Sequence, residues 1–275
     1  MTSFDVVAVL RKITKIKKIG HTGTLDPFAT GVLPVCIGKS TKLIEYLPDD
    51  KEYTATVKFG ADTDTYDLEG DITKIYDTKI EKQQLEQTLK EFSGEIEQYP
   101  PIYSAIKVNG KKLYDYARKG EKVEIKPRKI FISKIELLEF NEKEQTAKID
   151  IACSKGTYIR SIAYDIGQKL NCGGHLIALE RTKAGMFSLN TTIKLEDIKS
   201  IEDVENNLIN PTKVLPQTKY NLTIEEKERV IHGMTIKNRL TNCEEVVFLV
   251  YGDRMYGIGY SEKDNIKVKK VFEEL

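Results

Sequence analysis

The pattern of apolar and polar residues predicts several amphipathic helices along this chain. Apolar side chains recur three and four residues apart, the period of a helix that buries one face. Each run follows a capping residue or precedes a residue that ends helices, because Gly and Pro continue a helix poorly. Helices are expected after the caps Thr2, Ser40, Thr78 and Thr223 and over residues 159–170, with ends at Pro48, Gly94, Gly173 and Gly233.

Strict alternation of apolar and polar residues marks the strands. Tyr53, Ala55, Val57 and Phe59 alternate with polar residues, as in a strand with one buried face. Further strands are expected at residues 32–37, 129–140, 147–153, 245–251, 255–260 and 266–272. Helices and strands follow one another too irregularly for a doubly wound repeat, so the predicted fold class is α/β, of the α+β kind with a mixed sheet.

A stretch with little periodicity divides the chain. Residues 203–217 contain two prolines and are typical of a linker. The short helix and the strands that follow form a β-rich group of their own. We therefore predict a large domain at residues 1–213 and a small β-rich domain at residues 214–275.

Composition predicts a soluble globular protein. Of the 275 residues 31% are charged, and no apolar run approaches the roughly 18 to 20 residues that a membrane-spanning helix needs. The apolar stretch near the start is too short for a secretion signal, so we expect a cytoplasmic protein. Cys36, Cys153, Cys172 and Cys243 form no C-x-x-C pair and are expected in the core, and Cys172 with His175 provides too few ligands for a metal site.

The charge is unevenly distributed although the net charge is only +1. Residues 1–20 hold five basic residues and one acid, a balance of +4, and residues 101–130 hold nine and three, a balance of +6. Residues 61–100 hold eleven acids and four lysines, a balance of −7. The two basic segments suit either a phosphate backbone or ordinary solvated surface, and charge alone does not decide between them.

The stretch from Gly20 to Gly31 is the most unusual in the chain. Its glycines allow tight turns, and Pro27 keeps the preceding Asp26 out of helical geometry, so a carboxylate is presented from a rigid loop. Taken alone, an aspartate before proline is also a common turn device, and His21 is a common kind of loop or core residue.

Gly38-Lys39-Ser40, ahead of a predicted helix, resembles the end of a phosphate-binding loop. The pattern G-x-x-x-x-G-K-[ST] requires glycine where this chain has Leu33. A nucleotide-dependent enzyme is therefore the weakest alternative.

The Gly20–Gly31 segment resembles the catalytic motif of the TruB family of bacterial tRNA pseudouridine-55 synthases. Other segments agree with that family in order and spacing. They are Lys51–Tyr53 with Phe59-Gly60 and Asp62–Thr65, Tyr99–Lys107 with Gly110–Tyr114, Cys153–Arg160, and His175–Thr182. The resemblance covers nearly all of residues 2–190 and weakens afterwards.

The resemblance implies a pseudouridine-synthase catalytic fold with a central cleft, followed by a small RNA-binding domain like PUA domains. It implies an isomerase that converts uridine 55 in the T stem-loop of tRNA to pseudouridine, without a redox step, a metal or a nucleotide. We therefore expect no cofactor, and a monomer whose partner is tRNA. Family members carry a further strand before the Thr-Ser pair, so a start at Met1-Thr2-Ser3 predicts a core with one strand fewer.

The resemblance also implies roles for single residues. Asp26 is the catalytic carboxylate, Arg160 the cation that keeps it ionised, and Tyr53 the tyrosine against the target base, able to act as a base. The uridine must be flipped out of the folded tRNA arm, and His21 is expected to fill the gap. Substrate binding is further expected from Tyr158, Leu179 and Lys107.

Plain structural interpretations compete with these roles. Tyr53, Tyr158 and Leu179 are each also typical of core packing. The alternative function is a non-catalytic RNA-binding protein that uses the C-terminal domain. Catalysis requires Asp26 and Arg160 together, whereas binding alone requires neither.

Overall fold

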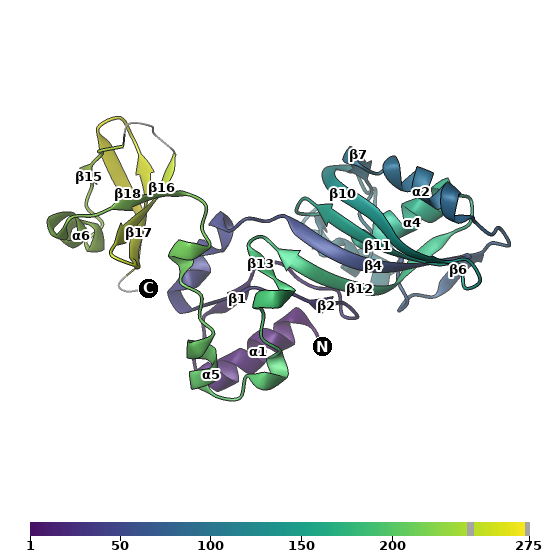
Figure 1. Cartoon of the computed structure of the whole chain (residues 1–275), viewed down its shortest axis with the longest axis horizontal. Helices are drawn as coiled ribbons and strands as arrows, with labels where there is room; N and C mark the ends of the chain where they lie inside the picture. The colour runs from purple at the N-terminus through teal and green to yellow at the C-terminus, as the bar shows by residue number, and fades with distance from the viewer. Residues whose placement is uncertain (241–244, 273–275) are drawn as a thin grey trace. The chain divides into compact units, whose positions relative to one another are not determined.

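The computed structural model describes residues 1–240 and 245–272, and the chain divides into two compact units. The first unit comprises Met1–Leu25, Leu33–Pro48 and Thr191–Leu275, and the second comprises Asp26–Val32 and Asp49–Asn190. Figure 1 shows the elements of both. The chain therefore enters the second unit at the predicted catalytic loop, leaves it, and enters it again.

The second unit is built on a mixed sheet. Its strands follow the spatial order β13-β12-β4-β11-β10-β7 with antiparallel neighbours, and the short β2 (Thr30–Gly31) runs parallel to β12. The bounds are β4 (Lys51–Phe59), β7 (Gly94–Gln98), β10 (Arg128–Asn141), β11 (Thr146–Cys153), β12 (Gly174–Ala184) and β13 (Phe187–Ser188).

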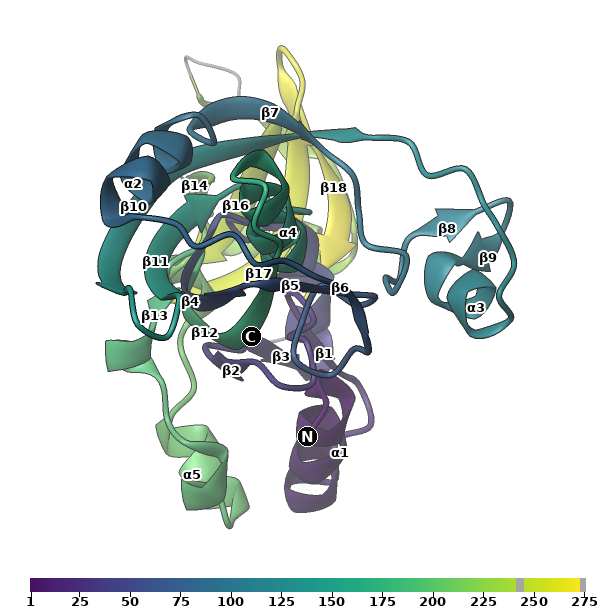
Figure 2. The same cartoon turned by 90° about the vertical axis from the view of Figure 1, so that its right-hand side faces the viewer.

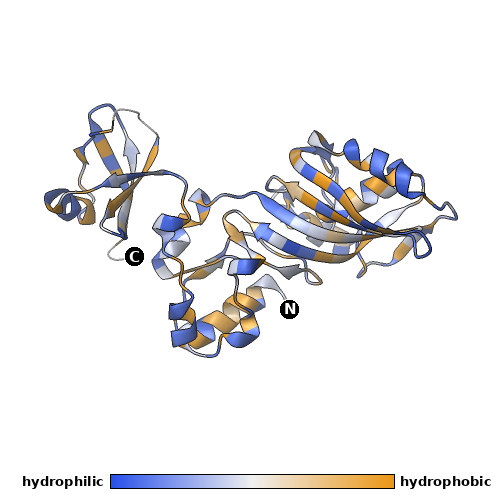
Figure 3. Ribbon diagram, in the orientation of Figure 1, coloured by the Kyte–Doolittle hydropathy of each residue, from blue (hydrophilic) through white to orange (hydrophobic). Residues whose placement is uncertain are grey.

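Helices α2 (Lys82–Lys90) and α4 (Ile159–Lys169) pack on this sheet (Figure 1). Alternate residues of β4 from Tyr53 to Phe59 are buried beneath them, as the sequence predicts. Figure 3 shows the corresponding bands of hydrophobic and hydrophilic residues along the strands. Burial of these apolar side chains stabilises the unit by roughly 25 cal/mol per Å² of apolar surface removed from water.

Smaller elements extend from the sheet. The β5–β6 hairpin, made of β5 (Ala61–Thr63) and β6 (Ile72–Ile75), follows β4 directly. After β7, strands β8 (Lys107–Val108) and β9 (Lys111–Lys112) lead into α3 (Leu113–Arg118). Figure 2 shows the β8–β9–α3 element standing away from the sheet. A large part of the basic segment 101–130 therefore lies on this outlying element of the unit.

The first unit carries a short β-ribbon beside α1 and a larger sheet formed by the C-terminal part of the chain. The ribbon pairs β1 with β3, and the larger sheet has the order β14-β16-β17-β18-β15. The bounds are α1 (Ser3–Thr14), β1 (Ile19–His21), β3 (Val35–Ile37), α5 (Ile201–Asn206), β14 (Thr218–Asn221), α6 (Ile224–Ile231), β15 (Ile236–Lys237), β16 (Val246–Tyr251), β17 (Arg254–Ser261) and β18 (Asn265–Val271). Short 3-10 helices are η1 (Gly38–Tyr46), η2 (Leu189–Thr191), η3 (Leu195–Asp197) and η4 (Pro211–Lys213).

The C-terminal sheet shares a core with η1. Leu43 of η1 is buried in one cluster with Phe248 and Phe272, and the Lys42 ammonium donates to the Val271 carbonyl at 3.2 Å. The compact units therefore do not follow the boundary predicted between residues 213 and 214. The assignment of residues 214–275 to an RNA-binding domain stays a prediction.

Most elements with a regular pattern are confirmed. The first helix is capped by Thr2, and the helix after Thr223 carries the expected capping box. Strands β4, β10 and β11 cover the predicted ranges, and β16 and β17 form the expected hairpin around Gly252-Asp253. Cys153 and Cys172 are buried and Cys36 is half-buried, whereas Cys243 lies outside the described residues.

Two predicted helix starts are wrong in detail. The helix expected after Ser40 is the 3-10 helix η1, which begins at Gly38, and the Ser40 hydroxyl donates to a backbone carbonyl. Helix α2 is capped by Glu81 with Gln84, one turn beyond the predicted cap Thr78. Short polar side chains bond the local backbone in several ways, so a capping pattern alone does not fix the first turn.

The strand and linker predictions fail where the pattern is irregular. The predictions omit β12, because bulges after Leu176 and Arg181 break its alternation of buried and exposed residues. The strand expected at 32–37 forms over Val35–Ile37. The predicted linker at 203–217 is wrong at its start, because α5 extends to Asn206.

Candidate active site

Asp26 stands in a short loop that is fastened to the sheet on its C-terminal side. The Ala29 amide donates to the Asp26 carbonyl at 2.9 Å and closes a turn. Beyond it, the Val32 amide donates to the Arg181 carbonyl at 2.8 Å, and Arg181 Nε donates to the Val32 carbonyl at 2.7 Å. A Cβ on Gly31, whose φ is +102°, would lie 2.2 Å from the Arg181 carbonyl oxygen, so glycine is required for this close approach.

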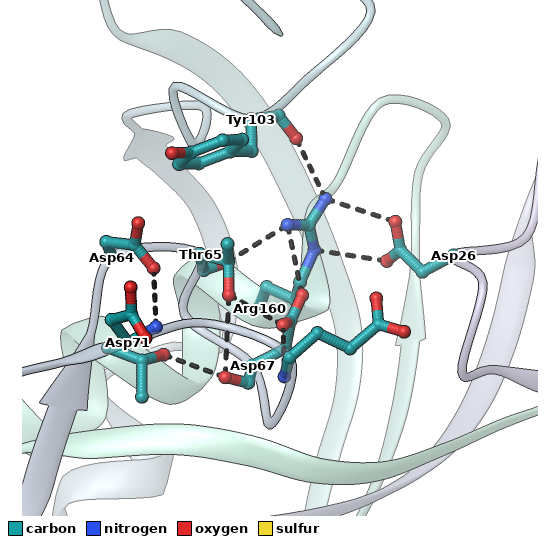
Figure 4. Close-up of polar contacts among 9 residues, drawn as sticks. Asp26, Asp64, Thr65, Asp67, Asp71, Tyr103 and Arg160 are labelled. Carbon is teal, nitrogen blue, oxygen red and sulfur yellow. Dashed lines mark hydrogen bonds and ion pairs between the residues drawn. The ribbon is translucent and has the colours of Figure 1, made fainter. Parts of the chain in front are cut away.

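Arg160 reaches the Asp26 carboxylate from the first turn of α4 (Figure 4). Its Nε donates to Oδ2 at 3.2 Å and its Nη2 donates to Oδ1 at 3.1 Å. These two nearly parallel hydrogen bonds use the planar fork of the guanidinium, which a lysine ammonium cannot reproduce. The predicted pairing of Asp26 with Arg160 is thus present in the structure.

The other donors of Arg160 are directed to a second set of partners (Figure 4). Nη1 donates to the Thr65 carbonyl at 3.0 Å and lies 3.2 Å from Oδ2 of Asp67, and Nη2 also donates to the Tyr103 carbonyl at 3.2 Å. Asp67 is buried and accepts from the Thr65 hydroxyl at 2.6 Å and from the Glu69 amide at 3.0 Å. The guanidinium is therefore fixed between two carboxylates.

The two carboxylates differ in their access to solvent. The Asp26 side chain is 32% exposed, whereas that of Asp67 is 5% exposed. Burial raises the pKa of the Asp26 carboxyl above its ordinary value, the Arg160 charge and hydrogen bonds lower it, and the nearby Asp67 raises it again. Asp26 is thus poorly solvated, reachable by a ligand, and dependent on Arg160 for its ionised form.

Tyr53 faces the buried side of β4, opposite Arg181 on β12. Burial raises the pKa of the Tyr53 phenol to about 12, against the charge and hydrogen bond of Arg181, which lower it, and the charge of Asp26 adds to the rise. The phenol is therefore neutral at physiological pH and donates a hydrogen bond more readily than it accepts a proton.

Tyr158 and Leu179 are held in place by the same unit. Tyr158 precedes α4, and its amide donates to Gln98 Oε1 at 2.8 Å while its carbonyl accepts from Gln98 Nε2 at 3.0 Å. Leu179 is buried in the core of the sheet, in register with Ala55 of β4. A core role is therefore real for Leu179, and contact of either residue with a uracil stays a prediction.

His21 and Lys107 lie on elements other than those that carry the Asp26–Arg160 contact. His21 lies in β1 of the first unit, in register with Val35, and is half-buried. Lys107 is exposed on β8, in register with Lys112. Their expected roles toward a substrate stay predictions.

The structure disfavours a phosphate cradle at Gly38-Lys39-Ser40. The Gly38 amide donates to the Lys18 carbonyl at 2.7 Å, and the Ser40 hydroxyl to the Ile37 carbonyl at 2.8 Å. Within residues 1–240 and 245–272, no three metal-binding side chains cluster, and no helix is long and apolar enough to cross a membrane.

Sequence reasoning missed Asp67 and Gln98 as parts of the site. Asp67 lies in the acidic segment 61–100, which is typical of solvated surface, yet it is buried against Arg160. The available signal was its place just after the Asp62–Thr65 segment. Gln98 gives no signal in the sequence, because its role depends on β7 lying beside the start of α4.

The sequence matches the two domains of one enzyme family. Residues 11–159 match the N-terminal domain of TruB family pseudouridylate synthases, and residues 160–215 match the C-terminal domain of tRNA pseudouridylate synthase B. The tRNA pseudouridine synthase B of Clostridium tetani is 43% identical, over 98% of this chain and 95% of its own. That of Francisella tularensis subsp. tularensis is 46% identical, over 100% and 92%.

Solved structures share the fold. A chain of an H/ACA ribonucleoprotein bound to a substrate RNA containing 2′-deoxyuridine has a TM-score of 0.69, at 24% identity over 99% of this chain and 81% of its own. A chain of a Cbf5-Nop10-Gar1 complex has a TM-score of 0.68, at 26% identity over 100% and 81%. The predicted mixed α/β fold with a β-rich C-terminal part is confirmed.

Removal of Arg160 should destabilise the second unit far more than removal of the Asp26 charge. Arg160→Met leaves the buried Asp67 carboxylate without its cation, and we expect the free energy of unfolding to fall by about 3–5 kcal/mol. Asp26→Asn should leave stability unchanged or slightly higher, because a carboxyl whose pKa is raised by folding favours the unfolded chain when ionised.

Urea denaturation at neutral pH measures both effects. Lys134→Met is the matched control, since it removes a surface cation that pairs with Glu136 and Asp150 and should change stability far less than Arg160→Met does. Equal losses for Arg160→Met and Lys134→Met would contradict the buried arrangement.

Proposed function

The chain belongs to the TruB family of pseudouridylate synthases, and from this premise we propose that it converts uridine 55 in the T arm of tRNA to pseudouridine. The observation that carries the proposal is the two-bond contact between Asp26 and Arg160. Asp26 lies in the Gly20–Gly31 segment, which resembles the family's catalytic motif, and Arg160 lies in the Cys153–Arg160 segment, which also resembles the family.

The reaction suits a single accessible carboxylate. The bond between N1 of uracil and C1′ of the ribose breaks, the base turns over, and a bond from C5 to C1′ forms. C5 then loses its proton and N1 takes one up, so the product is an isomer of uridine. Asp26 can assist by attack at C6, by an ester at C1′ or through a glycal route, and each route begins from the ionised carboxylate. Arg160 favours that form and fixes both of its oxygens.

Asp67 acts on the reaction through Arg160. Its carboxylate is buried and accepts from Thr65 and Glu69 as well as pairing with Arg160, which leaves it unsuited to attack a substrate. A glycosidase needs a second reactive carboxylate to activate water, whereas here the base stays bound and recombines with the sugar. The proposed reaction therefore requires only one reactive carboxylate, Asp26, with Asp67 as a supporting carboxylate.

The residues around Asp26 form the proposed uracil pocket. Tyr53 lies against the base, where its neutral phenol favours contact and hydrogen bonding over abstraction of a proton. Tyr158 and Leu179 close the pocket. His21 fills the position that the uridine leaves when it flips, a step that costs a few kcal/mol of lost stacking and pairing.

The exposed basic side chains bind the tRNA backbone. Lys107 and Lys112 are exposed and lie opposite each other on β8 and β9, and they provide two cations on the outlying element of the second unit. Residues 214–275 act as a PUA-like RNA-binding domain. The protein works as a monomer with no cofactor.

A direct assay tests the proposal. The purified protein is incubated with unmodified tRNA in buffer without cofactors, and pseudouridine is then mapped along the RNA. Pseudouridine at position 55 supports the full proposal, and pseudouridine elsewhere in the tRNA overturns the T-arm assignment. Binding without any pseudouridine favours the non-catalytic RNA-binding alternative.

Asp26→Asn should abolish pseudouridine formation while tRNA affinity changes by less than about tenfold. The substitution keeps the shape of the side chain but removes its charge and most of its nucleophilicity. Single-turnover rates at saturating enzyme and filter-binding affinities report the two properties separately. Wild-type turnover in this variant would end the assignment of Asp26 as the reacting group.

Charge reversal on the outlying element should weaken the salt dependence of tRNA binding. For Lys107→Glu with Lys112→Glu, the slope of log K against log salt should fall in magnitude by about 0.7–0.9 per lost phosphate contact. Lys143→Glu, on the exposed β10–β11 turn, is the matched control and should leave the slope unchanged. An identical slope in the double variant would place these lysines off the RNA path.

A further inference from the structure

One face of α4 holds the β5–β6 hairpin through a row of side chains. Arg160, Tyr164 and Gln168 are spaced four residues apart, so they lie one turn above another on the helix. Each contacts the hairpin or its connecting loop. The partners are Thr65 and Asp67 for Arg160, Tyr66 for Tyr164, whose ring centroids are 4.1 Å apart, and Asp62 for Gln168.

Asp62 anchors the hairpin at the far end of this row. The residue is 5% exposed, and its two carboxylate oxygens accept from Gln168 Nε2 at 3.0 and 2.9 Å. The carboxylate also accepts from the Tyr76 hydroxyl at 2.8 Å and from the Gly174 amide at 3.1 Å. A Cβ on Gly173 would lie 2.5 Å from the Tyr76 ring, so the chain is packed tightly around this carboxylate.

The loop between the Asp62 anchor and the Arg160 partners is short and fastened. The Thr63 hydroxyl donates to the Asp67 carbonyl at 2.8 Å, and the Leu176 amide donates to the Tyr66 carbonyl at 3.0 Å. The first bond connects the neighbour of Asp62 directly to Asp67, so we expect a shift of Asp62 to reach Asp67 through Thr63.

We propose that Asp62 and Gln168 are positioning residues for catalysis, because their contact fixes the hairpin on α4 where Thr65 and Asp67 hold the Arg160 guanidinium against Asp26. This inference rests on the proposed roles of Asp26 and Arg160. Neither Asp62 nor Gln168 touches reacting atoms, and both act through the guanidinium. A merely structural pair would instead affect the stability of the unit alone.

The test exchanges the carboxylate and the amide between positions 62 and 168. Gln168→Glu sets a second carboxylate against Asp62, and the single-turnover rate should fall about 10- to 100-fold, the loss typical of a displacement near 1 Å in a catalytic group. The double variant D62N/Q168E again places one amide against one carboxylate. The Tyr76 hydroxyl, 3.4 Å from Gln168 Oε1, is placed to donate to the exchanged acceptor, so the rate should recover.

The pH dependence of the single-turnover rate separates positioning from stability. Asp26 reacts as a carboxylate, so the rate is present above its pKa and is lost as the pH falls through it. The groups that act on this carboxyl are Arg160 from α4, Asp67 from the hairpin loop and Tyr53 from β4. A displaced guanidinium stabilises the Asp26 carboxylate less, so the pKa of Asp26 rises. The acid limb, which is the fall in rate at low pH, should therefore move to higher pH in Gln168→Glu and return in D62N/Q168E.

A second glutamine provides the matched control. The Gln145 amide is also buried and bonds the Ile80 peptide at 2.8 and 3.1 Å, so Gln145→Leu should lower the thermal midpoint without moving the acid limb. Gln168→Leu removes both bonds to Asp62 without adding charge and should also move the acid limb to higher pH. It replaces Gln168→Glu in the test if that variant does not fold.

The outcomes are distinct from those for the proposed function. A wild-type rate and acid limb in both Gln168 variants, or a folded D62N/Q168E that does not recover, would overturn the positioning role. Failure of the wild-type protein to form pseudouridine, or full activity of Asp26→Asn, would count against the proposed function instead.

Discussion

A single guanidinium held between two carboxylates is the constraint on which the rest of the site depends. Arg160 is 6% exposed, and a buried charge is strongly unfavourable unless its donors are paired. Its partners come from the Asp26 loop, from the hairpin loop at Thr65 and Asp67, and from the Tyr103 carbonyl. These segments are distant in the sequence, so satisfying one side chain fixes the mutual position of three loops.

Differences in environment suit the two carboxylates to different proposed roles. Asp67 has a hydroxyl, an amide and the guanidinium around it and is closed to solvent, whereas Asp26 is one-third exposed at the end of a fastened loop. Burial raises the pKa of the Asp26 carboxyl while Arg160 opposes that rise. Asp26 is thus a weakly solvated carboxyl group paired with a cation, the environment that its proposed role as the reacting group requires.

The sequence predicts those features that depend on local pattern or on a specific motif. Alternation locates β4, and the motif at Gly20–Gly31 identifies Asp26, because both signals lie within a few neighbouring residues. It does not predict β12, whose bulges hide its period, although β12 is the strand that fastens the Asp26 loop. Asp67 and Gln98 also escape prediction, since their contacts, with Arg160 and with the Tyr158 backbone, are set by the tertiary fold.

The central claim is that Arg160 keeps a desolvated Asp26 ionised, and the pKa of Asp26 tests it most directly. A carbon-13 NMR titration of aspartate side-chain carboxyls, with the Asp26 signal assigned through its loss in Asp26→Asn, measures this pKa in the wild-type chain and in Arg160→Lys. We predict a wild-type pKa above the ordinary 3.8 and a still higher pKa in Arg160→Lys, where the two-bond contact is lost. A pKa at or below 3.8, or one that Arg160→Lys leaves unchanged, would contradict it.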